Sequence, residues 1–152
     1  MTSPKVFIEN LNTSQTLLGL DFGDKTIGIA VSDNSHTIAT PIKTIKRKGT
    51  SKDLIELFNL ITEYNVGGLI IGFPLSLSGK ENTRTAKVKK FIKAIKLQKN
   101  INIALYDERF SSDVIFKELR KTQIPISKIK KKLDQQAAAY ILQGFLDNSK
   151  NN

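Results

Sequence analysis

Residues 17–33 read Leu17-Leu18-Gly19-Leu20-Asp21-Phe22-Gly23-Asp24-Lys25-Thr26-Ile27-Gly28-Ile29-Ala30-Val31-Ser32-Asp33. An apolar run ends at Asp21, and a short polar turn that contains Gly23 follows. From Ile27 to Val31, large apolar residues alternate with small ones, which is the pattern of a strand with one buried face. The stretch therefore predicts a β-hairpin whose first strand is central and buried and places Asp21 near its carboxyl end.

The second strand of this hairpin has one face without bulk. Gly28 and Ala30 lie on that face, so either another backbone or a phosphate chain could approach closely there. Asp21 also has two interpretations, because Asp is a common turn residue as well as a catalytic one. This stretch alone settles neither what approaches the small-residue face nor whether Asp21 is a turn residue or a catalytic one. The rest of the chain has to decide both questions.

Composition limits the kinds of chemistry that the chain can perform. At 152 residues it is long enough for one domain with a sizeable core. It has no cysteine and one histidine, His36 in a predicted loop, which excludes thiol chemistry and argues against a His-rich metal site. Catalysis would then depend on carboxylates, hydroxyls and bases, together with a hard metal ion.

The amino-terminal segment and the apolar runs indicate where the protein acts. No run approaches the roughly 20 apolar residues that cross a bilayer, and the first residues lack the features of a signal peptide. We expect a cytoplasmic protein with no membrane partner. The formal charge of +10 favours a polyanionic partner, although the abundance of Lys, Asn and Ile is also typical of an AT-rich genome.

The chain order predicts an α/β fold in a single domain, residues 16–147. Residues 1–15 are expected to be a flexible arm, in which Lys5–Ile8 could add an edge strand, and residues 148–152 a disordered tail. Strands are predicted at 16–32 (the hairpin), 37–46, 68–73 and 101–106, with Pro41 indicating an edge or a bulge. Helices are predicted at 52–65, 84–98 and 112–121, and a last one begins at Asp134.

These elements give a mixed five-stranded sheet with helices on both faces. Ser51 is the predicted cap of helix 52–65 and Thr83 that of helix 84–98, because their hydroxyls can accept from free backbone N–H groups. A basic connection precedes the last helix, and we expect no further domain boundary.

Three acidic residues fall where chain segments should converge. Asp21 ends the first strand, Glu108 follows the last strand, and Asp134 opens the last helix. Sites in α/β sheets form at the carboxyl ends of strands and at adjacent helix starts. Such carboxylates would repel one another without a divalent cation, and Mg²⁺ prefers hard oxygen ligands. Taken singly, Asp134 could be only a helix cap and Glu108 only an ion-pair partner of Arg109.

Four segments resemble the YqgF/RuvX-like family of ribonuclease-H-fold proteins, in the family's order and at its spacing. They span nearly the whole chain and are Gly19–Asp33, Ile71-Gly72-Phe73-Pro74-Leu75 with Gly79, Asp107-Glu108-Arg109-Phe110-Ser111-Ser112, and Asp134-Gln135-Gln136-Ala137-Ala138-Ala139-Tyr140-Ile141-Leu142-Gln143. The resemblance implies a ribonuclease H-like fold and a nuclease dependent on Mg²⁺ or Mn²⁺.

The same resemblance implies roles for individual residues. Asp21, Glu108 and Asp134 match the family's catalytic, metal-binding acids. The chain departs from the family at two positions beside the turn, where many members carry a small residue in place of Asp24 and an Arg in place of Thr26. Both departures reduce the positive charge available there.

Basic residues near the predicted strand ends are candidates for substrate contact. The candidates are Lys25, Lys80, Arg84 and Arg109. Arg109 is the strongest, because a guanidinium can pair with a phosphate through two hydrogen bonds. The alternative for Arg109 is an ion pair with a neighbouring acid. The lysine-rich face of 87–99 favours a solvated surface, whereas 128–132 favours substrate contact. Since basic and aromatic residues do not alternate, we expect recognition by backbone and shape.

The leading expectation is a metal-dependent endonuclease acting on structured nucleic acid, in 5′-end processing of pre-16S rRNA during ribosome biogenesis. Ribosomal particles would then be partners, and the protein would be a monomer or a homodimer. The alternatives are a Holliday junction resolvase acting on branched DNA and a non-catalytic RNA-binding module. A nucleotide-binding relative of the actin and sugar-kinase folds ranks last, because the chain is short for two lobes.

Overall fold

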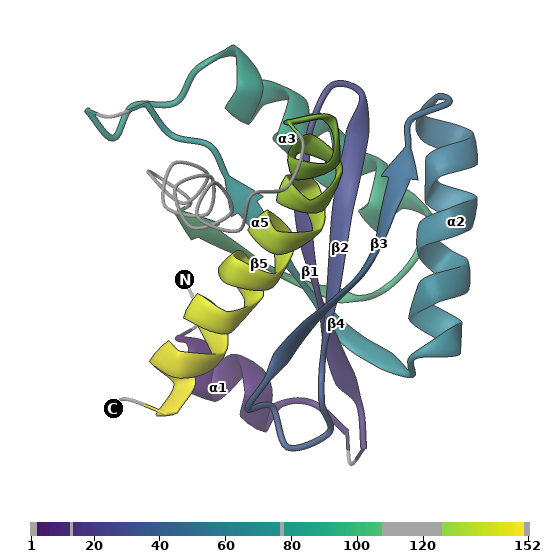
Figure 1. Cartoon of the computed structure of the whole chain (residues 1–152). Helices are drawn as coiled ribbons and strands as arrows, with labels where there is room; N and C mark the ends of the chain where they lie inside the picture. Colours follow the sequence, from purple (N-terminus) through teal and green to yellow (C-terminus); the bar gives the residue numbers. More distant parts are fainter. Residues whose placement is uncertain (1–2, 13, 77, 108–125, 151–152) are drawn as a thin grey trace.

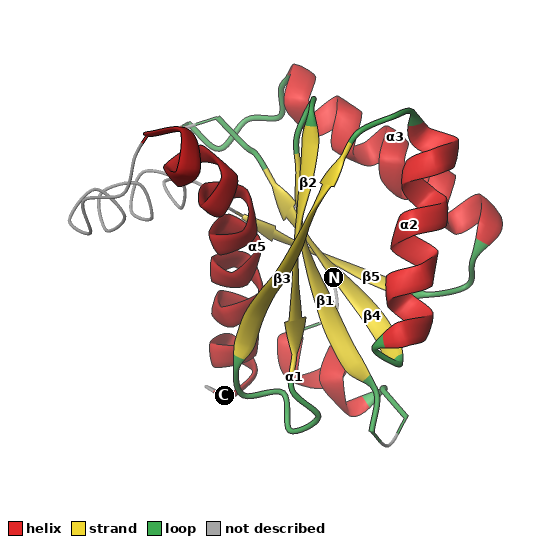
Figure 2. Ribbon diagram, turned by 45° about the vertical axis from the view of Figure 1, so that its right-hand side comes forward, coloured by secondary structure: helices red, strands yellow, loops and turns green. Residues whose placement is uncertain are grey.

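The computed structural model describes residues 3–12, 14–76, 78–107 and 126–150, with side chains of the last range from Gln135 onward. One sheet runs through the molecule, with helices against both of its faces (Figures 1 and 2). This arrangement confirms the predicted α/β class.

The sheet has five strands in the order β3-β2-β1-β4-β5. Their bounds are β1 Thr16–Phe22, β2 Thr26–Ser32, β3 Ala39–Lys46, β4 Val66–Phe73 and β5 Asn102–Asp107. β1 pairs antiparallel with β2 and parallel with β4, so the first strand of the hairpin is the central one, as predicted. β3 lies at an edge, and its pairing with β2 shifts register beside Pro41, which confirms both expectations for that proline.

Two hydrophobic cores lie on opposite faces of the sheet. Helices α2 (Thr50–Glu63) and α3 (Thr83–Gln98) cover the face to which Leu18, Leu20 and Phe22 point. Helices α1 (Pro4–Glu9) and α5 (Ile126–Lys150) cover the face to which Leu17 points. Figure 2 shows α5 on one side of the sheet and α2 and α3 on the other. Successive residues of β1 therefore serve different cores, as the pleat of a strand requires.

Helix α5 lies very close to the hairpin where the hairpin carries small residues. A Cβ built on Gly19 would lie 2.7 Å from the Leu142 Cβ and 2.8 Å from the Ala138 carbonyl oxygen. Ala30 of β2 is fully buried in the same core as Ala138 and Leu142. On the small-residue face of β2, the structure therefore shows α5 packed against Ala30.

The amino-terminal segment differs from the expected arm. Residues Pro4–Glu9 form helix α1, so the edge strand proposed for Lys5–Ile8 is wrong. Proline suits the first turn of a helix, where its missing N–H has no partner to lose, and the Ser3 hydroxyl accepts from the Val6 N–H at 3.3 Å. Phe7 is buried, with its ring edge-on to Phe145 of α5 at a centroid distance of 5.5 Å. At the other end of the chain, residues 148–150 continue α5 as helix rather than forming part of a disordered tail.

Both predicted helix caps are wrong by one or two residues. α2 is preceded by Gly49, at a positive φ of 118°, and has no side-chain cap, so Ser51 lies inside the first turn. α3 is capped by Asn82, whose Oδ1 accepts from the N–H groups of Arg84 and Thr85 at 2.9 and 3.1 Å. The amide side chain of Asn82 supplies this cap one residue before Thr83. The predicted helix at 112–121 lies outside the described residues.

Candidate active site

Asp21 lies at the carboxyl end of the central strand. It is the penultimate residue of β1, pairs with Gly28 of β2, and is half-buried. Leu17 and Gly19, at the same parity in β1, point to the core that α5 covers. Because side chains alternate along a strand, Asp21 faces the side of the sheet on which α5 lies.

The backbone of α5 brings position 134 toward this same edge. Ala39 N–H donates to the Gln143 Oε1 at 2.9 Å, and the Lys150 ammonium donates to the Ser35 carbonyl at 3.4 Å, so the end of α5 lies by the β2–β3 turn. The helix therefore runs from the end of β1 toward its start. Position 134 precedes Ala138, which contacts Gly19, by about one turn. The backbone thus carries positions 21 and 134 to the same end of the sheet.

Asp134 does not open the last helix, contrary to the prediction. α5 begins at Ile126, so Asp134 lies about two turns inside it and cannot be an N-cap. The sequence signal was misleading because Asp before an apolar run is typical of a cap. Here the basic segment that precedes it is itself helical.

The other two predicted residues at this edge, Glu108 and Arg109, lie outside the described residues. The structure does describe Asp107, the residue before them. Asp107 ends β5 and pairs with Phe73, the last residue of β4. β4 and β5 therefore end level with each other beside β1, at the edge where Asp21 lies.

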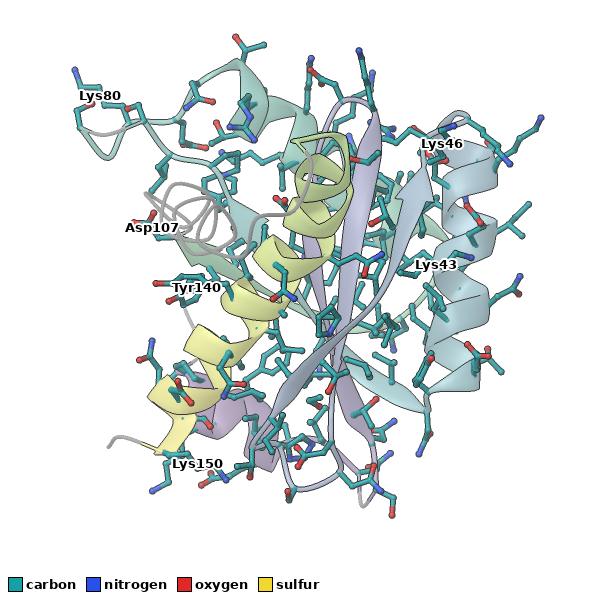
Figure 3. The ribbon with its side chains drawn as sticks, viewed as in Figure 1. Lys43, Lys46, Lys80, Asp107, Tyr140 and Lys150 are labelled. Atoms are coloured by element: carbon teal, nitrogen blue, oxygen red, sulfur yellow. The ribbon has the colours of Figure 1, made fainter. Side chains whose placement is uncertain are left out.

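Three predicted substrate-binding residues are exposed near this edge. Lys25 lies in the β1–β2 turn and Arg84 in the first turn of α3. Lys80 lies in the loop between β4 and α3, where its N–H donates to the Ser76 Oγ at 3.1 Å. Figure 3 shows Lys80 on an extension of the ribbon, pointing away from the sheet and on the same side as Asp107. Lys80 thus extends from the loop that follows β4 rather than from a strand end.

An ion pair joins the hairpin turn to α3. The Lys87 ammonium donates to the Asp24 Oδ1 at 2.8 Å. This contact, with smaller contributions from Arg84 and Arg47, lowers the pKa of the Asp24 carboxyl below its ordinary value of 3.8. Phe22, Gly23, Asp24, Arg84 and Lys87 line a hollow of about 280 Å³ at this point.

Arg47 fixes the hairpin turn from the other side. Its Nε donates to the Asp53 Oδ2 at 3.0 Å, and its Nη1 to the Gly23 carbonyl at 3.4 Å. Its guanidinium carbon lies 4.5 Å from the centre of the Phe22 ring. Asp53 is fully buried, and its Oδ1 also accepts from the Lys48 N–H at 2.9 Å. These contacts hold the turn after Asp21 against α2.

Sequence reasoning missed Arg47, Asp53 and the Asp24–Lys87 pair as parts of this region. Arg47 was visible only as part of a basic loop, and Asp53 only as an acid in the first turn of a helix, which favours the helix dipole wherever it occurs. Lys87 is one of several lysines that recur along α3, and nothing in the sequence sets it apart from the others. No local signal distinguishes these residues, because each acts through a partner on another element.

The side chains that the structure describes do not by themselves form a metal site. Among those, no group of three or more His, Asp or Glu side chains is arranged to hold a metal ion. Asp21 is the described member of the predicted acidic set.

In the same described part of the chain, no helix combines the length and the apolar character needed to cross a membrane.

Relatives of this chain carry a nuclease name. The chain is 39% identical over 146 residues to a protein of Paramagnetospirillum magneticum named "Putative pre-16S rRNA nuclease", covering 96% of this chain and 94% of that one. A protein of the same name from Thermoanaerobacter pseudethanolicus is 41% identical over 136 residues, covering 89% and 98%. Both alignments span nearly the whole of each protein.

Solved structures of resolvases have the same fold. Thermus thermophilus RuvC, in complex with a Holliday junction substrate, superposes with a TM-score of 0.54 at 9% identity, covering 90% of this chain and 97% of that one. The yeast mitochondrial Holliday junction resolvase Ydc2 gives a TM-score of 0.52 at 15% identity, covering 97% and 84%. At these identities the likeness concerns the fold, which is the ribonuclease H-like fold predicted from the sequence. Residues 15–148 match the family model described as RuvX, Holliday junction resolvase, so this chain belongs to the RuvX family and is a nuclease that hydrolyses phosphodiester bonds.

Proposed function

We propose that this protein is a metal-dependent endonuclease that cleaves pre-16S rRNA at its 5′ end, with Asp21, Glu108 and Asp134 as its catalytic acids. The observation that supports the proposal most strongly is the position of Asp21. It is a half-buried carboxylate at the end of the central strand, on the face against which α5 packs. The full-length likeness to relatives named for pre-16S rRNA supports the choice of substrate.

The donor chemistry of this edge fits Mg²⁺ or Mn²⁺. The chain has no cysteine, and its histidine, His36, lies in the β2–β3 turn at the other end of the sheet, with its Nε2 2.8 Å from the Gln15 carbonyl. Carboxylate oxygens are the ligands that these hard cations prefer. Asp21, Glu108 and Asp134 would hold the metal, which when bound supplies an activated water and neutralises the leaving oxygen.

The protein's own residues would bind and orient the nucleic acid. Lys25, Arg84, Lys80 and Arg109 would contact backbone phosphates, which position a substrate without specifying its sequence. Arg47 and Asp53 would act indirectly by fixing the turn that follows Asp21. Ribosomal particles are the proposed setting and the cytoplasm the proposed location, with the protein acting as a monomer or a homodimer.

Cleavage by the Asp21→Asn variant tests the proposal. Wild type and variant are incubated with pre-16S rRNA and with a four-way DNA junction, each with and without Mg²⁺. Loss of a side chain outside the immediate ligands of a metal already lowers activity about 10- to 100-fold, so loss of a ligand should lower cleavage by at least about 100-fold. Binding without metal should not weaken, because a carboxylate repels phosphate rather than attracting it.

Asp147→Asn is the matched control. Asp147 is an exposed residue of α5 whose carboxylate accepts from Gln143 at 2.9 Å, far from Asp21 along the helix. If Asp21→Asn cleaves as fast as this control, the catalytic assignment is wrong. Cleavage of the junction but not of the RNA would instead favour the resolvase alternative, which the family description supports. Salt-sensitive binding without any metal-dependent cleavage would support a binding module.

A further inference from the structure

Two elements line the hollow beside the hairpin turn, at the edge of the sheet where β1 ends. Phe22, Gly23 and Asp24 come from the end of β1 and the turn, whereas Arg84 and Lys87 come from α3. Arg84 and Lys87 are three residues apart on a helix, so they share a face and both reach the hollow. Two cations from one helix thus face the backbone that directly follows Asp21.

A carboxylate that lines the same hollow is already paired with one of these cations, Lys87. The Asp24 Oδ1 lies 2.8 Å from the Lys87 Nζ, and Arg84 and Arg47 also stabilise the charged form of Asp24, whose pKa is lowered. The Asp24 and Lys87 side chains are 69% and 50% exposed. Ion pairs at such exposed positions contribute little to stability, so an external anion can replace the carboxylate at small cost.

We propose that this hollow is a phosphodiester subsite, and that the Asp24 carboxylate holds the place of a substrate phosphate in the free protein. A backbone phosphate would pair with Lys87 and Arg84 and displace Asp24, which rotates outward into solvent. Asp24 would therefore reduce affinity by competing for the same cations. The proposal rests on the proposed function, since it assumes a nucleic-acid substrate at this edge.

The phosphate in this subsite is not the one that is cleaved. Phe22 points to the core under α3, whereas Asp21, one residue earlier, faces the side of α5. The hollow and the Asp21 carboxylate thus lie on opposite faces at the end of the same strand. A substrate strand that passes over this end would place one phosphate at each. The subsite should therefore affect KM and leave kcat nearly unchanged.

Binding measurements on the full-length protein test the subsite. Fluorescence anisotropy without divalent metal measures the affinity for a labelled four-way DNA junction and for a labelled pre-16S rRNA fragment. Asp24→Asn should bind both about fivefold more tightly, because the phosphate no longer has to displace a carboxylate from Lys87. Because the same phosphate is bound in both proteins, the slope of log K against log salt should stay nearly unchanged.

The role of Lys87 is measured in both backgrounds. Lys87→Ala should weaken binding, and the loss should be larger in the Asp24→Asn background, where no carboxylate competes for the ammonium. Glu56→Gln and Lys43→Ala are matched controls, because Glu56 and Lys43 form an exposed ion pair at 3.3 Å between α2 and β3. Figure 3 shows Lys43 on the edge strand β3. These controls change the net charge by the same amounts as the test variants.

The outcomes separate the two proposals. If Asp24→Asn and Lys87→Ala bind like their charge-matched controls while wild type binds and cleaves, the subsite is refuted and the nuclease proposal stands. A large fall in kcat for Lys87→Ala, with KM unchanged, would also refute it. If wild type neither binds nor cleaves either substrate, the proposed function fails, and the subsite fails with it.

Discussion

Gly19 and Asp21 show how neighbouring positions of one strand serve different needs. Both point toward α5 from β1. Gly19 has no side chain, so the helix backbone comes within van der Waals distance of the strand, and Asp21 lies beyond that contact, where the strand ends. The distance between α5 and Asp21 therefore depends on the lack of a side chain at position 19, two residues before Asp21.

Replacing Gly19 by Ala should destabilise the protein. The new Cβ would meet the Leu142 Cβ at 2.7 Å and the Ala138 carbonyl oxygen at 2.8 Å, and neither can move without shifting α5. Overpacking of this kind costs about 1–3 kcal/mol of unfolding free energy. Urea denaturation followed by circular dichroism measures the loss, and cleavage assays on the folded fraction measure any displacement of α5 from Asp21.

Gly67→Ala is the comparison for this prediction. Its Cβ would also be crowded, but by the far ends of the Gln15 and Leu11 side chains, which can rotate away. We expect it to lose less stability than Gly19→Ala and to cleave normally. An equal loss in the two variants would contradict the argument that the helix backbone, rather than crowding in general, sets the cost.

The strands were predictable because their signals are local. Alternation in β2 and a continuous apolar run in β4 each fit a strand whatever the rest of the chain does. The starts of the helices were not predictable to the residue, because neighbouring Asn82 and Thr83 are both acceptable caps. The fold of the first residues was missed for another reason: α1 is stabilised by packing on α5, at the far end of the sequence.

Phe7→Ala tests whether α1 is part of the core. Phe7 is 6% exposed and packs edge-on against Phe145, so its truncation should lower the free energy of unfolding by about 3–5 kcal/mol. Val6→Ala, at a position that is 44% exposed in the same helix, should change it by less than about 0.5 kcal/mol. Urea denaturation of both variants gives the comparison. Equal effects would mean that the segment behaves as the flexible arm that its sequence suggested.

The candidate site was predictable to a smaller extent than the fold. The position of Asp21 follows from the hairpin pattern, which gives the end of the strand directly. The Asp24–Lys87 pair joins residues 63 positions apart, and each of them looks like an ordinary surface charge in the sequence. Such pairs become visible only when the turn and α3 are placed side by side.

For the whole molecule, the formal charge of +10 should dominate the encounter with nucleic acid. Four phosphate contacts, one each at Lys25, Lys80 and Arg109 and one shared by Arg84 and Lys87, would give a slope of log K against log salt of about −3.6 on duplex DNA, which is roughly a 10²-fold loss of affinity between about 50 and 200 mM salt. Anisotropy titrations over this range, without divalent metal, measure the slope. A slope near zero would contradict recognition through the phosphate backbone.

The end of α5 has a practical consequence for handling the protein. Lys150 lies by the β2–β3 turn (Figure 3), and Asp21 lies at the other end of the sheet, where β1 ends. A fluorophore or a surface anchor attached there would stand well clear of a long, bulky ligand. Single-molecule and immobilised formats therefore leave the end of the sheet that carries Asp21 open to solvent.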